Sequence, residues 1–323
     1  MGRLGRRWLG VVCCVALAGC GGDETAPPDG PPTMDPPRAL PRIGVVFGEP
    51  QPGYERLLHE EARRRGRELD VRPGYGQATA TEAAVLALVD LKVEAILLFP
   101  SSPDLLQRAR RLAADREVPL LLALRGDGRS GAWVGVASGE LAAEAGQRVA
   151  ARLAADGIAE PRIVVVEDAR WPESRRRAEV IIDAIEQRFG RVEVRLRQPL
   201  EGTAELTLES LLPLMARMQS VDVLIGGDPA STAVACEAAK RSGIASRACV
   251  VGISDDSALL DAARLPAARM ALVSYTREAM ALALFAGIET LLATPLEQRD
   301  ELRRAVPCAL IGLEPATAEK PGS

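Results

Sequence analysis

From Arg42 to Leu313, short apolar runs alternate with longer segments that have the period of an amphipathic helix. Runs such as Ile43–Phe47 and Ala95–Phe99 are almost wholly apolar, which is typical of strands buried on both faces. Strands that alternate with helices in this way predict parallel β-sheets covered by helices on both sides. This alternation constrains the fold more than any other feature, and it predicts an α/β chain.

The expected strands are Ile43–Phe47, Leu69–Arg72, Ala95–Phe99, Pro119–Leu124, Trp133–Val136, Arg162–Val166, Val192–Leu196, Val221–Ile225, Cys249–Ile253, Met270–Ser274 and Ala309–Leu313. The expected helices are Tyr54–Arg65, Thr81–Asp90, Pro103–Asp115, Leu141–Ala155, Glu173–Arg188, Ala204–Gln219, Ala230–Arg241 and Arg277–Leu292. About ten strands would be many for one sheet, so two sheets of five or six, one in each of two lobes, are expected. Ligands of such sheets bind beyond the carboxyl ends of the strands, which places one cleft between facing lobes. Gly157 and Gly243 follow helices, where a positive φ is expected.

Composition indicates the number of domains and argues against one class of partner. A chain of 323 residues with 47 % hydrophobic residues suits about two domains of roughly 100–200 residues each. The formal net charge of -4 argues against a nucleic-acid partner, which would need a basic surface.

The first twenty residues have the form of a secretory signal. Arg3, Arg6 and Arg7 precede the apolar run Trp8–Ala18, which is too short for a bilayer that needs about 20 residues. The run ends in Leu17-Ala18-Gly19-Cys20, which resembles the lipobox of bacterial lipoproteins. That resemblance implies lipid on Cys20 and an anchor on the periplasmic side of the outer or inner membrane; the alternative is a plain signal peptide with a chance cysteine. Residues 21–41 contain seven prolines and are expected to form an extended tether.

Few residues offer catalytic or metal chemistry. The single histidine, His59, lies in a charged helical segment, and neither GxSxG nor a Walker loop is present. An enzyme, a metal site and a cofactor are therefore not expected. Cys236, Cys249 and Cys308 are expected to be buried thiols, with one disulfide as the alternative. The acidic pairs Glu60-Glu61 and Asp255-Asp256 are interpreted as solvated or capping groups.

Six segments, in order, resemble the periplasmic binding proteins of the ribose-binding and lac-repressor-core type. They are Ile43–Phe47, Val93–Pro100, Glu117–Leu120, Val134–Ser138, Val221–Asp228 and Cys249–Ser254. The resemblance implies two similar Rossmann-like lobes joined by three crossings near Ala137–Gly139, Ser274–Thr276 and Ala305–Cys308. It assigns residues 42–138 and 276–304 to an N-terminal lobe, residues 139–275 and 305–315 to a C-terminal lobe, and residues 316–323 to a flexible tail. Ligand binding would close the lobes by hinge motion.

The resemblance also assigns candidate ligand-binding residues. Arg125 stands where the family has a sugar-binding arginine, and Arg175 or Arg177 stands where another opens a second-lobe helix. Asp228 matches an acid near the cleft, and Tyr275 falls at the second crossing. Three aromatic side chains near strand ends could stack on a ligand: Phe47, Tyr54 and Trp171. The alternatives are an exposed loop cation for Arg125, a helix N-cap for Asp228 and ordinary packing for the aromatics.

The sequence departs from the family at three polar positions. Ser138-Gly139 replaces an Asp-Asn pair, Gly227 replaces an asparagine, and Ser254 replaces an aspartate. Ser138 and Ser254 remain candidates because of their positions. Carboxylates and amides bind neighbouring sugar hydroxyls, so their loss favours a more anionic ligand, or a larger and less polar one, over a neutral pyranose or pentose.

These features predict a monomeric, lipid-anchored solute-binding protein that captures a small sugar-like or anionic molecule for an ABC importer. The alternative is a sensory or interaction lipoprotein that uses the same fold to signal to a membrane partner. A transcription regulator is not expected, because a signal and a Pro-rich spacer stand where a helix-turn-helix would be.

Overall fold

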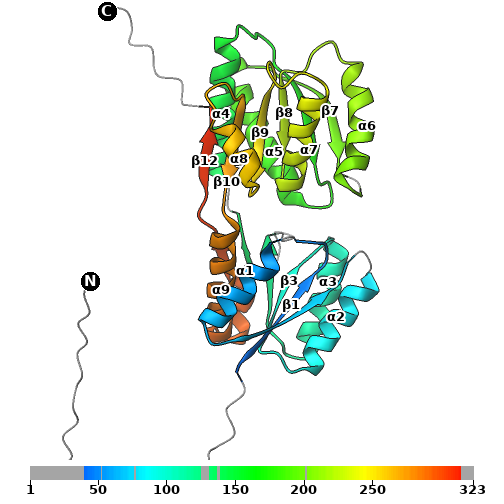
Figure 1. The fold of residues 1–323 in the computed structure, drawn as a ribbon, viewed down its shortest axis with the longest axis vertical. Coiled ribbons are helices and arrows are strands. Elements are labelled where there is room, and N and C mark those ends of the chain that lie inside the picture. The colour runs from blue at the N-terminus through cyan, green and yellow to red at the C-terminus, as the bar shows by residue number, and fades with distance from the viewer. Residues whose placement is uncertain are drawn as a thin grey trace, which may run out of the picture. The chain divides into compact units, whose positions relative to one another are not determined.

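The computed structural model describes residues 40–51, 53–75, 78–124, 131–136, 139–200 and 202–313. These residues form two lobes, each built on a six-stranded sheet with helices on its faces (Figure 1). The predicted α/β class, with one mostly parallel sheet in each lobe, is confirmed. Within the described ranges, no helix has both the length and the apolar character needed to cross a membrane.

The first lobe has the strand order β11-β5-β4-β3-β1-β2, and every pairing in it is parallel. Its strands are β1 (Arg42–Phe47), β2 (Glu68–Pro73), β3 (Ala95–Phe99), β4 (Leu120–Leu124), β5 (Ala132–Gly135) and β11 (Arg303–Ala305). Its helices are α1 (Tyr54–Arg64), α2 (Ala78–Asp90), α3 (Pro103–Ala114), α9 (Arg277–Ala293) and the 3-10 helix η1 (Leu296–Glu301).

The second lobe has the strand order β12-β10-β9-β8-β6-β7, and only the β10–β12 pairing described in it is antiparallel. Its strands are β6 (Arg162–Glu167), β7 (Glu193–Pro199), β8 (Val223–Gly226), β9 (Cys249–Ser254), β10 (Met270–Ser274) and β12 (Ala309–Gly312). Its helices are α4 (Gly139–Ala155), α5 (Pro172–Phe189), α6 (Ala204–Ala216), α7 (Pro229–Arg241) and α8 (Ser257–Ala263).

Both faces of the central strands are buried, which explains their continuous apolar sequences. In β3, Ala95, Leu97 and Phe99 join one cluster with α1 and α9, whereas Ile96 and Leu98 join another with α2 and α3. All five residues of this strand are buried. A strand covered on both sides has no polar face, so its polar neighbours lie beyond its ends.

The chain passes between the two sheets at three places. It runs from β5 of the first sheet into α4, from β10 of the second sheet into α9, and from β11 of the first sheet into β12 of the second. Helix α9 packs on α1 and on strands β3, β4 and β5, so it belongs to the first lobe (Figure 1). Tyr275 and Thr276 form the short second connection, and Val306, Pro307 and Cys308 form the third.

Local signals place most helix ends. Ser102, Thr203, Asp228 and Thr276 each accept a hydrogen bond from a backbone N–H in the first turn of the helix that they precede. Gly157 and Gly243 have φ values of 76° and 71°, as predicted for residues that end helices. Helix α8 and strand β11 were not predicted, because α8 has seven residues and β11 has three exposed ones.

The three cysteines beyond the leader are free thiols. Cys249 is fully buried, whereas Cys236 and Cys308 are partly buried. The disulfide alternative is therefore wrong, and the prediction of buried thiols holds fully only for Cys249. Burial, with smaller contributions from the charges of Asp256 and Glu237, raises the pKa of the Cys236 thiol to about 12.

Thr232 of α7 fits closely against the ends of β8 and β9. Its hydroxyl accepts the Ile253 N–H at 3.0 Å and donates to the Asp228 carbonyl at 2.8 Å. A Cβ on Gly226 would lie 2.3 Å from Thr232 Cα, and one on Gly252 would lie 2.2 Å from its Oγ1. The two glycines thus let the start of α7 approach the sheet.

We expect Gly226→Ala to lower the free energy of unfolding by about 1–3 kcal/mol, because the added methyl overpacks against backbone atoms of α7. Gly139→Ala is the matched control, since a Cβ at the first residue of α4 meets nothing within 4 Å. Urea unfolding followed by circular dichroism measures both. Equal midpoints for the two variants would contradict this account of α7 packing.

Candidate functional site

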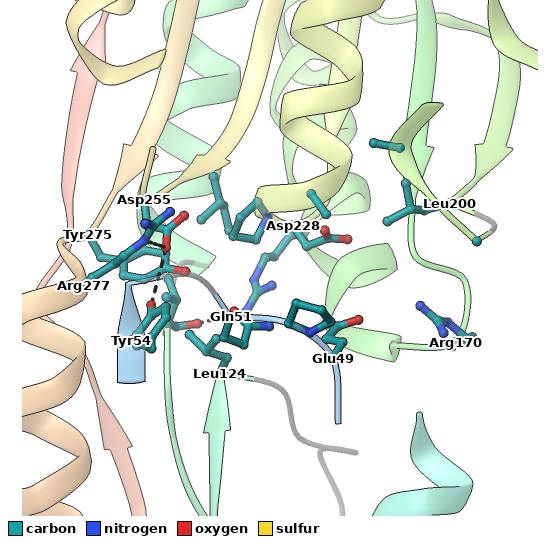
Figure 2. Close-up of a pocket in the computed structure, with 18 residues that line it drawn as sticks. Glu49, Gln51, Tyr54, Leu124, Arg170, Leu200, Asp228, Asp255, Tyr275 and Arg277 are labelled. Carbon is teal, nitrogen blue, oxygen red and sulfur yellow. Dashed lines mark hydrogen bonds and ion pairs between the residues drawn. The ribbon is translucent and has the colours of Figure 1, made fainter. Parts of the chain in front are cut away.

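A cavity of about 350 Å³ lies where the two lobes meet (Figure 2). Its described lining comprises Glu49, Pro50, Gln51, Tyr54, Leu124, Val136 and Arg277 from the first lobe and the adjoining crossing, and Arg170, Arg177, Leu200, Gly202, Ala204, Asp228, Pro229, Ala230, Ile253, Asp255 and Tyr275 from the second lobe. Most of these residues stand at, or just after, the carboxyl ends of parallel strands. This is the edge where ligands of open α/β sheets bind.

Asp255 is the centre of an interaction that joins the lobes. It follows β9 of the second lobe, and its Oδ2 accepts a hydrogen bond from Arg277 Nε of the first lobe at 2.9 Å. The Tyr54 hydroxyl donates to the same oxygen over a longer distance of 3.5 Å. The Arg277 guanidinium also lies 6.0 Å from the centre of the Tyr54 ring. Figure 2 shows the three side chains converging at one end of the cavity.

Two tyrosines face the cavity as neutral hydroxyls. Burial raises the pKa of Tyr54 well above its ordinary value, and the nearby Tyr275 and Asp255 raise it further. Burial is also the main cause of the raised pKa of Tyr275, and Asp255 adds to it. Both phenols therefore stay protonated at neutral pH and can donate as well as accept hydrogen bonds.

The Asp228 carboxylate lines the cavity but is engaged by hydroxyl and backbone donors. Its Oδ1 accepts the Ser231 N–H at 3.0 Å, and its Oδ2 accepts the Ser231 and Ser174 hydroxyls at 2.7 and 2.8 Å. The side chain thus caps α7 and ties it to the start of α5. The predicted alternative, a helix N-cap, describes these contacts.

The close approach of α5 also explains Gly227. A Cβ on Gly227 would lie 2.3 Å from the Ser174 carbonyl oxygen. An asparagine cannot occupy this position unless α5 moves. The loss of this amide from the cleft is therefore built into the packing of the second lobe.

Of the two arginine candidates on α5, Arg175 and Arg177, only Arg177 lines the cavity. Its Nη2 donates to the Val136 carbonyl at 3.1 Å and its Nη1 to the Gly227 carbonyl at 3.4 Å. Arg175 instead turns outward, with 62 % of its side chain exposed, and pairs with Glu167 at 3.3 Å.

The remaining candidates fall into two groups. Phe47, Trp171 and Ser254 are buried and are not among the cavity-lining residues. Phe47 packs on Phe99 with ring centres 4.7 Å apart, and Ser254 Oγ accepts the Asp256 N–H at 3.1 Å. Trp171 precedes α5 of the second lobe but packs with an apolar cluster of the first lobe. Arg125, Ser138 and the lipidation candidate Cys20 lie outside the described residues.

Several lining residues were not singled out from the sequence, among them Glu49, Gln51, Arg170, Asp255 and Arg277. Asp255 was interpreted as a solvated or capping group, which is wrong because it is largely buried and paired with Arg277. Asp256 does cap a helix, as expected, by accepting the Ala258 N–H at 2.8 Å. Searching the two or three residues after each predicted strand would have found Glu49 and Asp255.

Among the described residues, no cluster of three or more His, Cys, Asp or Glu side chains could hold a metal ion. Arg277 and Asp255 of the cavity instead pair with each other, and Arg177 donates to two backbone carbonyls. Arg170 donates two hydrogen bonds to Asp168, at 2.8 and 2.7 Å. The site is therefore suited to binding through hydrogen bonds and charge.

No protein-family model and no curated protein matches the sequence. Solved structures do match in fold. An ABC transporter solute-binding protein from Agrobacterium vitis with bound allitol has a TM-score of 0.71 at 15 % identity, covering 84 % of this chain and 95 % of that one. An ABC sugar transporter subunit from Rhodobacter sphaeroides 2.4.1 has a TM-score of 0.69 at 13 % identity, covering 84 % and 97 %. A galactofuranose-binding protein has a TM-score of 0.68 at 17 % identity, covering 86 % and 96 %.

These likenesses show the fold of the chain, which is the two-lobed fold of type 1 periplasmic solute-binding proteins. The resemblance predicted from the six sequence segments is confirmed at this level. At 13–17 % identity, the matches do not establish a ligand for this chain.

The Asp255–Arg277 pair gives a testable coupling between the lobes. We expect Arg277→Gln to lower the free energy of unfolding by about 1–2 kcal/mol, because it leaves a largely buried carboxylate without its cation. Asp255→Asn combined with Arg277→Gln should cost less than the sum of the single changes, by about 0.5–1 kcal/mol.

The exposed pair Arg264–Asp261 provides the matched control, with 57 % and 73 % of the side chains exposed. Its double-mutant cycle should give a coupling near zero. Urea unfolding measures both cycles, and equal couplings would show that Asp255 and Arg277 behave as an ordinary surface pair.

Proposed function

We propose that this chain is an extracytoplasmic solute-binding protein that captures a small polar molecule by closure of its two lobes, for delivery to an ABC importer. One observation carries the proposal: a cavity of about 350 Å³ is lined by both lobes at the carboxyl ends of their strands. A ligand in such a cavity contacts both lobes at once and favours the arrangement in which they meet.

The position of the cavity beside the crossings supports this role. Tyr275 lies in the second connection between the sheets and also lines the cavity, and Val136 lies next to the first connection. A ligand that contacts these residues would touch the segments that must bend when the lobes move. Binding and hinge motion would then be linked through a few side chains.

The structural neighbours support a polyol-sized ligand. Their bound molecules include allitol, α-D-tagatopyranose and myo-inositol. The cavity of this chain offers Gln51, Tyr54 and Tyr275 as uncharged hydrogen-bonding groups. Leu124 and Ile253 offer apolar surface for a carbon skeleton.

A lipid anchor fits the same role. With lipid on Cys20, the Pro-rich residues 21–41 would act as a tether that keeps the lobes close to a membrane transporter. Tethering raises the effective concentration of a binding protein at its partner without any new contact.

Thermal melting of residues 42–323 against sugars, polyols, amino acids, nucleosides and small anions tests solute capture. A ligand that binds only the folded state stabilises it by about 2.7 kcal/mol at about 100 times its Kd, so we expect one chemical group to raise the melting midpoint. No shift across the library, in a protein that melts cooperatively, would favour the sensory or interaction alternative.

Tryptophan emission can report closure in the same experiment. Trp133→Phe leaves Trp171 as the only tryptophan of residues 42–323. Trp171 packs with an apolar cluster of the other lobe, so closure on a ligand should shift its emission to shorter wavelength. The melting ligand should produce this shift, and Trp171→Phe should abolish it.

The anchor is tested with the full chain expressed in a bacterial host. We expect Cys20→Ser to move the protein from the membrane fraction to the soluble extracytoplasmic fraction, because the acylated residue is lost. Cys14→Ser is the matched control, since Cys14 lies within the predicted leader and should be removed with it. Fractionation of the unchanged protein into the soluble extract would rule out the anchor.

A further inference from the structure

We propose that the ligand carries a carboxylate, as in a sugar acid or hydroxy acid, and that Arg177 binds this group. The inference rests on the proposed solute-binding function and names the ligand class for the same cavity. It follows from which charges in the cavity have ionic partners and which do not.

Two cavity arginines are paired with carboxylates. Arg277 binds Asp255 at 2.9 Å, and Arg170 makes a two-bond contact with Asp168. Each of these guanidinium charges is therefore balanced by an adjacent acid. A ligand anion would have to compete with Asp255 or Asp168 for them.

Arg177 differs from both. Its two hydrogen bonds run to the neutral carbonyls of Val136 and Gly227, and no carboxylate of the described residues lies within ion-pair distance of it. Asp228, the nearby acid of the lining, is held by the Ser231 N–H and by two serine hydroxyls. A guanidinium has five N–H donors, so the carbonyl contacts leave part of its hydrogen-bonding capacity for a ligand.

The buried surroundings of Arg177 strengthen its interaction with an anionic partner. Burial lowers the pKa of Arg177, and the more distant charges of Asp228 and Glu173 offset this only in part. A guanidinium nevertheless stays charged in proteins, so the cost of its burial is best offset by an ion pair. A carboxylate can accept two parallel hydrogen bonds from the planar guanidinium. Such charged hydrogen bonds are stronger than those that neutral hydroxyls would accept.

Helix α6 of the second lobe adds positive potential at the same wall. Ala204 begins α6 and lines the cavity. The helix has 13 residues, so the partial positive charge at its N-terminus is developed. The N-terminus of α7 is already met by the Asp228 carboxylate that caps it. Helix N-termini favour anions, and here α6 supports a site already provided by the Arg177 side chain.

The rest of the lining fits the remainder of such a molecule. The Tyr54 and Tyr275 hydroxyls are neutral and can bind ligand hydroxyls, and Leu124, Val136 and Ile253 can contact carbon atoms. A cavity of about 350 Å³ admits a molecule of sugar size. The arrangement therefore provides Arg177 as the cationic contact and several neutral contacts, while the lining carboxylate Glu49 acts on the charge of Arg170, and this matches a polyhydroxylated monoanion.

Matched ligand pairs test the inference with residues 42–323. Isothermal titration would compare D-galactose with D-galacturonate, D-glucose with D-gluconate, and glycerol with D-glycerate. We expect one acid to bind at least about tenfold more tightly than its neutral partner, because a hydrogen bond to a charged group is worth more than a neutral one. Raising the salt concentration should weaken binding of the acid but not of the neutral molecule.

Substitutions in α5 test whether Arg177 is responsible for the tighter binding of the acid. Arg177→Gln should raise the Kd of the preferred acid by about 10- to 100-fold and remove most of its advantage over the neutral partner. Arg177→Lys should retain part of the advantage, because it keeps the charge but loses the planar fork. Arg175→Gln is the matched control, since it removes one positive charge from the same helix at an exposed position and should leave both affinities unchanged.

Circular dichroism and thermal melting check that each variant folds. The salt dependence of binding to the unchanged protein tests the ionic contact with the ligand without any substitution. Preferred binding of a neutral molecule, with no effect of salt, would overturn the carboxylate assignment and leave the solute-binding function standing. Binding of neither member of any pair, or an acid preference that survives Arg177→Gln, would overturn the inference. Only absence of a ligand from the broad library would count against the proposed function itself.

Discussion

Burial of both faces of each sheet is the constraint on which the rest of the structure depends. Helices cover both faces of β1 and β3 in the first sheet and both faces of β8 and β9 in the second, so these strands are almost wholly apolar. Polar and charged groups are consequently concentrated beyond the strand ends. The chemistry of the cavity is thus a result of the same burial that stabilises the lobes.

Close packing then decides which polar groups remain at that edge. Gly226 and Gly252 let Thr232 bring the start of α7 against the sheet, and Gly227 lets Ser174 of α5 approach Asp228. These contacts fix Asp228 as a cap and exclude a side chain at position 227. At position 227 the chain therefore departs from the pattern that it resembles for a structural reason, and Arg177 is left as a charge facing the cavity.

Much of the fold could be predicted from the sequence, because its signals are local. The apolar runs predicted β3 and β10 with both ends correct, and the strand that begins at Cys249 with its start correct. Strand β11 could not be predicted, because Arg303 and Arg304 are exposed and its pairing with β5 depends on a partner more than 160 residues away in the sequence. Helix α8 is too short for a periodic pattern to distinguish it from a loop.

The site was less predictable, because it depends on which residues meet across the lobes. Tyr54, Arg177, Asp228 and Tyr275 were named from the sequence and do line the cavity. The pairing of Asp255 with Arg277 joins residues on different lobes, and no spacing along the chain encodes it. Whether Arg175 or Arg177 lines the cavity likewise depends on which side of α5 faces the carboxyl ends of the strands in the second sheet.

The position of Trp171 has a consequence for the energetics of closure. This side chain belongs to the second lobe, yet it packs with apolar residues of the first and is only 2 % exposed. Separation of the lobes would expose it to water, so part of the free energy that favours closure comes from the protein and does not depend on a ligand. A contact of this kind shifts the empty protein toward its closed arrangement, which raises the apparent affinity for a ligand and reduces the change in conformation that binding produces.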